Sequence, residues 1–580
     1  MVIYNREKFI KTALDIPLMC FLLLALLSCV FSVNRFASFQ SIFLLLGCFM
    51  LFYSTANSIK KDGDTNFVFY FISWLCLGLA LSGIAGYYYS GAQRSFGLFT
   101  NPNLLGGFLA SGFGFLLFQI VKARGRDRVL FIIASAASLF CLVLTKSRGG
   151  LLVAVCSICL FIILINILAG KKAVSGRYRR NLTLGLLALL AVSLTPLNPI
   201  MKRAMTLGVT DEAAYSRTKI WGSAIKLYRE KPFTGFGLNT YKDVVPKYYF
   251  PVGGSIGNFT RVQHHAHNEY LQFLAETGIA GGVLILVFLF VIIRQFLFII
   301  RKTLDKEKLL IAASVFTALC GLLVHALVDF NLHFLPTLLL LVLLTGVLFS
   351  EYLSEKNYRV FKDNKMLSFN SSLTLVAVIF LGLAGMNFFS VYFFEQKPAT
   401  SLILERNLKL STFLNPANAG SFAELGKLYR YNYRTTKDPK FIGLAEESFK
   451  EAQKKNPANA HYHKHLALLY YIAGIKKEVF PEYIKAVKLY PYDVFLKFEL
   501  AYLYAESADY NLALQYVREA VRLEPNFVGA HLLLSGIYSK LKNPKAAVYE
   551  RNLAFEINAR YKDAAVIDYE KMLVSTGERR

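Results

Sequence analysis

Residues 264–282 read HHAHNEYLQFLAETGIAGG, and they lead directly into an apolar segment at 278–300. The run contains three histidines, together with Asn268 and Glu276. About 20 apolar residues are what an α-helix needs to cross roughly 30 Å of hydrocarbon. The stretch therefore predicts a membrane-spanning helix with polar chemistry gathered at its start.

The rest of the chain has the composition of a membrane protein. Its 580 residues are 55% hydrophobic, with a mean hydropathy of +0.42, which is too apolar for a soluble protein and too long for one domain. No small-residue cleavage site follows the first apolar segment, so we interpret that segment as a span. The predicted spans are 14–33, 36–54, 66–84, 103–121, 129–146, 149–169, 181–197, 278–300, 309–328, 334–350 and 372–392.

Clusters of lysine and arginine mark every second connection between these spans. The clusters lie near residues 60–61, 122–128, 171–180, 301–308 and 356–365. Short loops rich in Lys and Arg stay in the cytoplasm. We therefore expect a cytoplasmic N-terminus, with the long loop 198–277 and everything after residue 392 outside. This topology also explains the net charge of +27, so no nucleic-acid partner is expected.

All eight cysteines lie in apolar stretches, and none follows residue 320. Cys156 and Cys159 form a C-x-x-C pattern in the middle of a predicted span. Small buried apolar side chains explain this pattern better than redox chemistry. The sequence therefore suggests neither a disulfide framework nor a zinc site.

The last third of the chain contains an internal repeat. Pro457, Pro491 and Pro525 are 34 residues apart, and so are Ala452, Ala486 and Ala520, as well as Tyr470, Tyr504 and Tyr538. Small residues allow two helices to approach closely, and a period of 34 resembles the tetratricopeptide repeat. We expect an all-α chain with a transmembrane domain at 1–397 and an extracytoplasmic α-solenoid at 398–580. Such arrays usually bind a protein partner, although a purely structural appendage is the alternative.

The long outer loop carries a second group of unusual residues. Arg217 and Trp221 are four apart, so they share one face of a helix, which a turn at Pro232, Gly235 and Gly237 would end. Arg148 lies between two spans, where a charge usually faces a polar cavity or a partner. The alternative is that Arg148 extends to the outer headgroups.

In combination, these segments resemble the O-antigen ligase and polymerase superfamily over about residues 10–395. The resemblance rests on Ser216–Arg217 with Trp221, on Pro232–Gly235–Gly237, on Ser147–Arg148–Gly149, and on His267–Asn268–Leu271–Glu276–Gly278. It implies an all-helical membrane bundle that transfers a glycan from an undecaprenyl-diphosphate carrier on the outer face of the inner membrane. It also implies that neither a metal ion nor another cofactor is needed.

The resemblance assigns the catalytic roles to His267, Arg148 and Arg217. Guanidinium groups suit the oxygens of a departing diphosphate, and imidazole can take the proton of an acceptor hydroxyl. We expect an in-line displacement that inverts the anomeric carbon. Substrate binding is assigned to Arg148 and Arg217, and in addition to His265, Trp221 and Asn268. Glu276 and Gly278 are expected to have structural roles.

Some residues keep two interpretations. His264 and His265 either line the acceptor path or are structural. His325 and Asp329 share a helical face, and they either extend a polar cavity or form a buried hydrogen-bonded pair.

The acceptor is likewise open. A ligase is the leading hypothesis, with a lipid acceptor. A polymerase acting on another lipid-linked repeat, and an oligosaccharyltransferase acting on exported proteins, differ from it only in the acceptor. A transporter is less favoured, because its polar groups would lie near the bilayer midplane.

Overall fold

The computed structural model describes residues 9–99, 101–169, 212–250, 264–354, 358–359, 382–396 and 400–560. It divides into two units that do not follow the order of the chain. We call Met1–Leu27, Ser41–Asp211 and His265–Ala377 the membrane unit. The repeat unit consists of Ser28–Gln40, Glu212–His264 and Val378–Arg580. The domain boundary predicted at 397/398 stays a prediction.

The predicted all-helical fold is confirmed. Among the described residues, seven helices are long and apolar enough to cross a membrane: α2 (Arg35–Ser58), α3 (Asp62–Ser90), α4 (Pro102–Lys122), α5 (Gly125–Thr145), α6 (Arg148–Ala169), α11 (Glu269–Lys302) and α12 (Lys306–His325). Two apolar helices are shorter, α1 (Asp15–Phe31) and α13 (Leu335–Leu348). The chain is thus a multi-pass membrane protein. A pairing of β1 (Phe9–Ile10) with β2 (Tyr358–Arg359) is the strand structure of the described residues.

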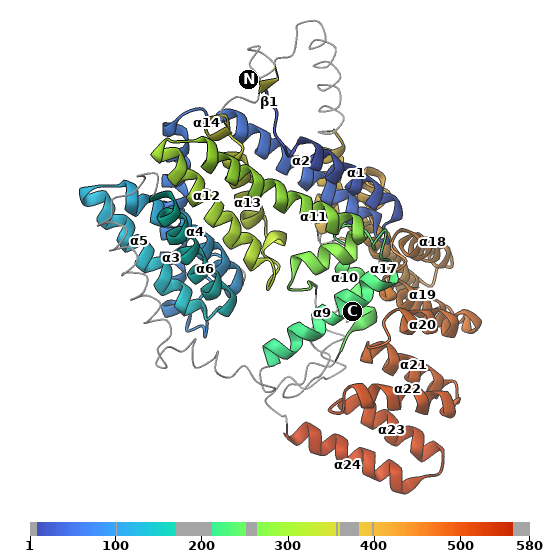
Figure 1. Cartoon of the computed structure of the whole chain (residues 1–580). Coiled ribbons are helices and arrows are strands. Elements are labelled where there is room, and N and C mark those ends of the chain that lie inside the picture. The colour runs from blue at the N-terminus through green and yellow to red at the C-terminus, as the bar shows by residue number, and fades with distance from the viewer. Residues whose placement is uncertain are drawn as a thin grey trace, which may run out of the picture. The chain divides into compact units, whose positions relative to one another are not determined.

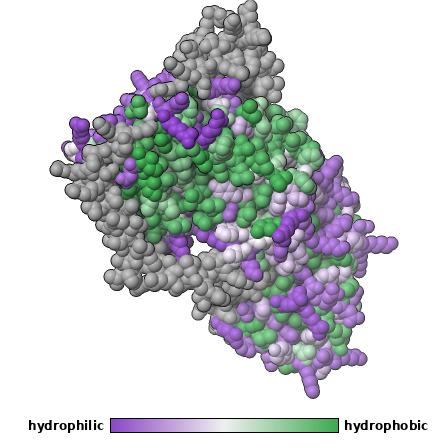
Figure 2. Space-filling view, viewed as in Figure 1, coloured by the Kyte–Doolittle hydropathy of each residue, from purple (hydrophilic) through white to green (hydrophobic). Residues whose placement is uncertain are grey.

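Nine of the eleven predicted spans coincide with these helices. The span predicted at 181–197 lies outside the described residues, and the one at 372–392 is described only from residue 382, in a helix that runs to 395. Apolar side chains such as Ile16, Phe67 and Leu286 are more than half exposed, as expected of surfaces that face lipid. Figure 2 shows a broad apolar surface over the helices and a mixed, largely hydrophilic surface over the repeats.

Helix α4 lies at the centre of the membrane unit and packs against α3, α5, α6 and α12 (Figure 1). Its sequence contains four glycines, and small residues allow helix backbones to approach closely in a membrane. A Cβ atom at Gly114 would lie 2.7 Å from the carbonyl oxygen of Ser314. A Cβ atom at Gly150 would lie 2.9 Å from the carbonyl carbon of Gly106. The glycines therefore set the close packing of α4 against α12 and α6.

The membrane unit has two chemically distinct ends. At the basic end, α4 and α11 finish while α5 and α12 begin, and Lys122 forms an ion pair with Glu307 across them. At the histidine end, α5 and α12 finish, while α4, α6, α11 and α13 begin. These ends correspond to the loops predicted to be cytoplasmic and external, respectively, and that orientation stays a prediction.

In the part that the structure describes, the repeat unit contains four antiparallel helix pairs (Figure 1). They are α17 (Ala419–Thr436) with α18 (Lys440–Lys455), α19 (Ala460–Ile472) with α20 (Lys476–Leu489), α21 (Val494–Glu506) with α22 (Tyr510–Leu523), and α23 (Val528–Lys540) with α24 (Pro544–Arg560). Helices α19, α21 and α23 begin 34 residues apart. The alanines at 452, 486 and 520 are fully buried where the helices meet. The tetratricopeptide-like repeat is thereby confirmed.

The described part of the loop predicted to be external belongs to the repeat unit. Helix α9 (Glu212–Glu230) is followed by a turn, by the short α10 (Tyr241–Val244) and by a 3₁₀ turn at Val245–Tyr248. Gly237 has φ 110°, and a Cβ atom there would lie 2.3 Å from the hydroxyl of Ser32. Only glycine fits this position. The turn is held further because Phe236 accepts a hydrogen bond from the backbone N–H of Val33 at 3.0 Å.

One carboxylate joins three parts of the repeat unit. Asp243 of α10 accepts hydrogen bonds from the side-chain amides of Asn34 and Asn456, each at 3.0 Å. Asn34 lies between α1 and α2, and Asn456 ends α18. Burial raises the pKa of Asp243, while the two amides and Lys242 oppose that shift. The outer loop is therefore fastened directly to the repeats.

Candidate active site

His267 lies immediately before α11, at the histidine end of the membrane unit. Asn268 caps the helix, because its side-chain oxygen accepts a hydrogen bond from the backbone N–H of Leu271 at 3.0 Å. His267 itself has φ 49°, a left-handed conformation that non-glycine residues rarely adopt. Such strained residues are concentrated at functional sites.

Asp329 holds the imidazole of His267 in place. Nδ1 of His267 lies 3.1 Å from Oδ1 of Asp329, and the aspartate is 2% exposed while the histidine is 28% exposed. The ring also contacts Phe330 edge-on, at 4.9 Å between ring centroids. A carboxylate can only accept a hydrogen bond, so Nδ1 of neutral His267 carries the hydrogen that it donates to Asp329. Nε2 is then the unprotonated, basic nitrogen. The arrangement can remove a proton from a hydroxyl at Nε2.

A second polar cluster lies beside this pair and joins α11 to the turn before α13. The carboxylate of Glu269 accepts hydrogen bonds from the backbone N–H groups of Leu332 and His333, at 2.6 and 3.1 Å. It also lies 2.7 Å from Nδ1 of His333. Gln272 bridges Nε2 of His333, at 2.9 Å, and the carboxylate of Glu276, at 3.3 Å.

The electrostatics of this cluster favour a protonated His333. Burial alone would lower the pKa of His333, but the charge and hydrogen bond of Glu269, with Glu276 behind it, raise it to about 9. Sequence reasoning missed both Glu269 and His333, because their pairing joins residues 64 positions apart.

The two other histidines of the run differ from each other. The ring of His265 stacks on Phe330 at 4.4 Å and lies 4.9 Å from the ring of His333. His264 is exposed. His265 thus lies beside the catalytic candidate, whereas a role of either residue in the acceptor path stays a prediction.

Arg148 begins α6 at the same end of the membrane unit. Ser147 caps that helix by accepting a hydrogen bond from the backbone N–H of Gly150 at 3.2 Å, and Lys146 before it has φ 51°. A Cβ atom on Gly149 would lie 3.6 Å from Nε2 of His325, the last residue of α12. Asp329 follows His325 by one turn. The structure therefore places the start of α6 and the His267–Asp329 pair at the same end of the helix bundle.

Arg94 is another cation at this end that sequence reasoning did not single out. Its Nε donates a hydrogen bond to the carbonyl oxygen of Thr145 at 2.8 Å, and its Nη2 donates one to Asn103 at 2.7 Å. Arg94 thereby ties the loop before α4 to the turn that carries Arg148. The available signal was its position in a loop predicted to be external.

Helix α9 carries Arg217 and Trp221, both half-buried, one turn apart. The adjoining face of α9 is anchored by Ile220, Ala224 and Leu227, which are buried. Ser223 adds a hydrogen bond to the carbonyl oxygen of Tyr248 at 2.9 Å. These residues belong to the repeat unit, so a cavity shared by Arg217, Arg148 and His267 stays a prediction.

Glu276 and Gly278 lie in the first turns of α11. Glu276 is 3% exposed. Gly278 has φ 68° and ψ −165°, where the helix is kinked. This conformation is open to glycine and almost closed to other residues.

The side chains of His325 and Asp329 contact different residues. The ring of His325 packs over Gly107 of α4, whereas the carboxylate of Asp329 faces His267. Among the described residues, no group of three His, Cys, Asp or Glu side chains is placed to hold a metal ion.

Comparison with known proteins finds a family model that matches part of the chain and solved structures that are weakly similar to another part. No curated protein matches the chain. The solved structure of MamA is 18% identical, with a TM-score of 0.25, and covers 28% of this chain and 90% of its own. YrrB, described as a TPR protein with an unusual peptide-binding site, is 17% identical, with a TM-score of 0.24, and covers 30% of this chain and 84% of its own. Residues 133–286, which include Arg148, Arg217 and His267, match the family model described as O-antigen ligase.

Proposed function

We propose that the chain transfers a glycan from an undecaprenyl-diphosphate carrier to an acceptor hydroxyl at the outer face of a bacterial inner membrane. The match of residues 133–286 supports glycan transfer at the level of the superfamily. The observation that carries the proposal is the His267–Asp329 pair at a strained helix start, because it is a general base held in one tautomer.

The proposed step needs no metal ion. The acceptor oxygen attacks the anomeric carbon while Nε2 of His267 takes its proton. The bond between that carbon and the diphosphate oxygen breaks, and the diphosphate leaves with the electron pair. Arg148 and Arg217 bind the departing diphosphate, since guanidinium groups form paired hydrogen bonds with phosphate oxygens. Attack opposite the leaving group inverts the anomeric configuration.

His265, Trp221 and Asn268 are the further residues that we assign to substrate binding. His265 and Phe330 form a stacked pair next to His267, and such a surface suits the apolar face of a sugar ring. Glu276 and Gly278 are assigned a structural role, because they set the path of α11 just after His267.

The repeats favour a partner of protein character. Their helix pairs form an α-solenoid, an architecture that offers an extended surface to a partner. We place them on the extracytoplasmic side, where an exported protein is an alternative acceptor to a lipid or a lipid-linked glycan.

Transfer by the reconstituted full-length protein tests the proposal. The protein in liposomes would receive an undecaprenyl-diphosphate-linked glycan and, in separate reactions, a lipid, a lipid-linked glycan or an exported protein as acceptor. We expect His267→Gln to abolish transfer and Asp305→Asn, which changes a helix cap at the basic end of the membrane unit, to retain it. Near-normal transfer by His267→Gln would refute the assignment, and the acceptor that is used separates ligase, polymerase and oligosaccharyltransferase.

A further inference from the structure

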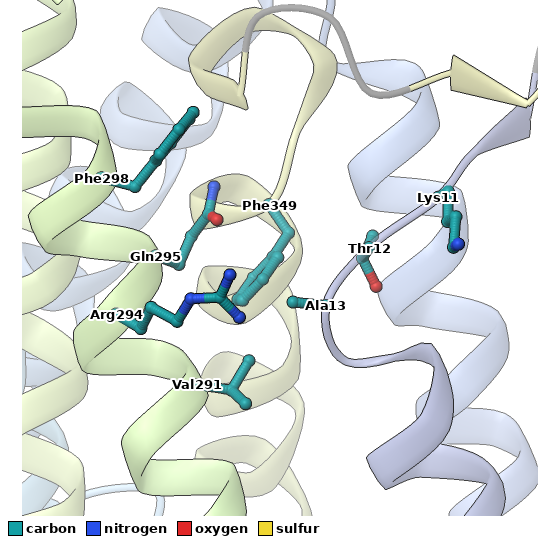
Figure 3. A pocket seen from close by; sticks show the side chains of 8 residues that line it. All are labelled: Lys11, Thr12, Ala13, Val291, Arg294, Gln295, Phe298 and Phe349. Carbon is teal, nitrogen blue, oxygen red and sulfur yellow. The ribbon is translucent and has the colours of Figure 1, made fainter. Parts of the chain in front are cut away.

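A cavity of about 120 Å³ lies at the basic end of the membrane unit. Its lining comes from the segment before α1, from the last turns of α11 and from the end of α13: Lys11, Thr12, Ala13, Val291, Arg294, Gln295, Phe298 and Phe349. Figure 3 shows the guanidinium of Arg294 extending from α11 toward the segment that carries Ala13. Lys11 and Thr12 lie on that same segment. The cavity is several times larger than the space that one water molecule needs.

The two cations of this cavity are exposed, and among the described residues neither has a carboxylate partner. Thr12 and Asp15 are hydrogen-bonded to each other, because the hydroxyl of Thr12 donates a hydrogen bond to the carboxylate of Asp15 at 2.6 Å. Gln295 donates to the carbonyl oxygen of Leu348 at 3.4 Å and so holds the end of α13 beside α11. The positive charge of the cavity is therefore not neutralised within the described protein.

The position of Arg294 in α11 is unusual for a cation. It follows Phe290 by one turn and precedes Phe298 by one turn, so the three share a face. Phe290 is 63% exposed and Phe298 is 39% exposed, which marks this face as the lipid-contacting surface. Arg294 lies seven residues before Arg301, which is about 10 Å deeper along the helix. A charge at that depth is costly unless it meets a counter-charge.

A membrane phospholipid supplies that counter-charge at this depth. We propose that the cavity binds the headgroup of an anionic phospholipid, with the phosphate between Arg294 and Lys11. Guanidinium donors suit phosphate oxygens, and Lys11 adds a second positive charge. The hydroxyl and amide of Thr12 and Gln295 line the same space, while Val291, Phe298 and Phe349 contact the start of the acyl chains.

Native mass spectrometry of the full-length protein tests this site. The protein would be released from nanodiscs that contain equal amounts of phosphatidylglycerol and phosphatidylethanolamine. We expect retained phosphatidylglycerol in the wild-type protein, and a fall of about fivefold or more in Lys11→Gln/Arg294→Gln. Arg301→Gln is the matched control, because it removes an exposed cation of the same helix that does not line the cavity.

Two results would overturn the proposal. An equal loss in Arg301→Gln would mean that basic side chains attract anionic lipid without a site. Equal retention of phosphatidylethanolamine would mean that the cavity does not select a net negative headgroup. Arg294→Lys keeps the charge and guards against a folding defect, and we expect it to retain most of the bound phosphatidylglycerol.

Discussion

Nδ1 of His267 lies 3.1 Å from Oδ1 of Asp329, and it joins the start of α11 to the turn after α12. The aspartate is almost fully buried, so the hydrogen bond is shielded from water. His267 thus receives its orientation from a residue 62 positions away in the sequence.

This pair predicts a specific effect of Asp329→Asn. The amide fills the same space but presents an N–H as readily as an oxygen, so it no longer fixes the tautomer with a basic Nε2. By analogy with a serine-protease triad, kcat should fall roughly 10²–10⁴-fold. Transfer assays at saturating donor and acceptor measure it. Asp305→Asn is the control, because Asp305 caps α12 at the basic end and asparagine caps equally well.

The ion pair of Glu269 and His333 predicts a pH dependence of stability. The pKa of His333 is raised from 6.5 to about 9 in the folded protein, so the folded state holds the proton more tightly. The stabilisation is complete below pH 6.5 and is lost as the pH rises through about 9. Its full size corresponds to roughly 3 kcal/mol.

Thermal unfolding in detergent between pH 6 and 10 measures this dependence. We expect Tm of the wild-type protein to fall across that window, and the fall to be smaller in His333→Gln and in Glu269→Gln. His264→Gln removes an exposed histidine and should leave the profile unchanged. An unchanged profile in His333→Gln would contradict the assignment.

The hydrogen bond between Asp243 and Asn456 predicts that removal of the carboxylate loosens the attachment of the outer loop to the repeats. Asp243→Ala leaves the amide of Asn456 buried without its carboxylate acceptor, and an unsatisfied buried donor costs about 1–3 kcal/mol. Limited proteolysis within residues 231–250 should accelerate. Glu556→Ala, which removes an exposed carboxylate of the same unit, should not change it.

A double-mutant cycle isolates the contact. The effects of Asp243→Ala and Asn456→Ala on proteolysis and on Tm should not add, since each removes the same hydrogen bond. Strict additivity would show that the two residues act separately.

Much of the fold follows from the sequence for identifiable physical reasons. Nine apolar segments are helices because a helix satisfies all of its backbone hydrogen bonds within one segment, which hydrocarbon requires. The 34-residue period predicts the helix pairs because the fully buried alanines recur where two helices meet. The histidine run before the apolar segment predicts a spanning helix with polar residues at its start, and α11 begins at Glu269.

The candidate site was only partly predictable, because its contacts are tertiary. The sequence places His325 and Asp329 on one helical face, but it does not reveal that Asp329 faces His267 while His325 packs on Gly107. Arg94 carries no motif, and its role rests on a hydrogen bond to Thr145, 51 residues away. Local spacing identifies the residues of a helix face, but not their partners on other helices.

The contact between Gly107 and His325 supplies a test of packing at the histidine end. A Cβ atom on Gly107 would lie 2.5 Å from two ring atoms of His325, so Gly107→Ala must displace the ring. We expect a loss of about 1–3 kcal/mol in stability from overpacking. Transfer should also fall, because Asp329 follows the displaced residue by one turn.

Gly78→Ala is the matched control. Gly78 also lies in a spanning helix, nothing lies within 4 Å of its added Cβ, and alanine favours the helix. Gly107→Ala/His325→Ala provides the space that the methyl group needs, so its Tm should recover toward that of His325→Ala alone. If Gly107→Ala and Gly78→Ala unfold at the same temperature, His325 does not pack on α4 as described.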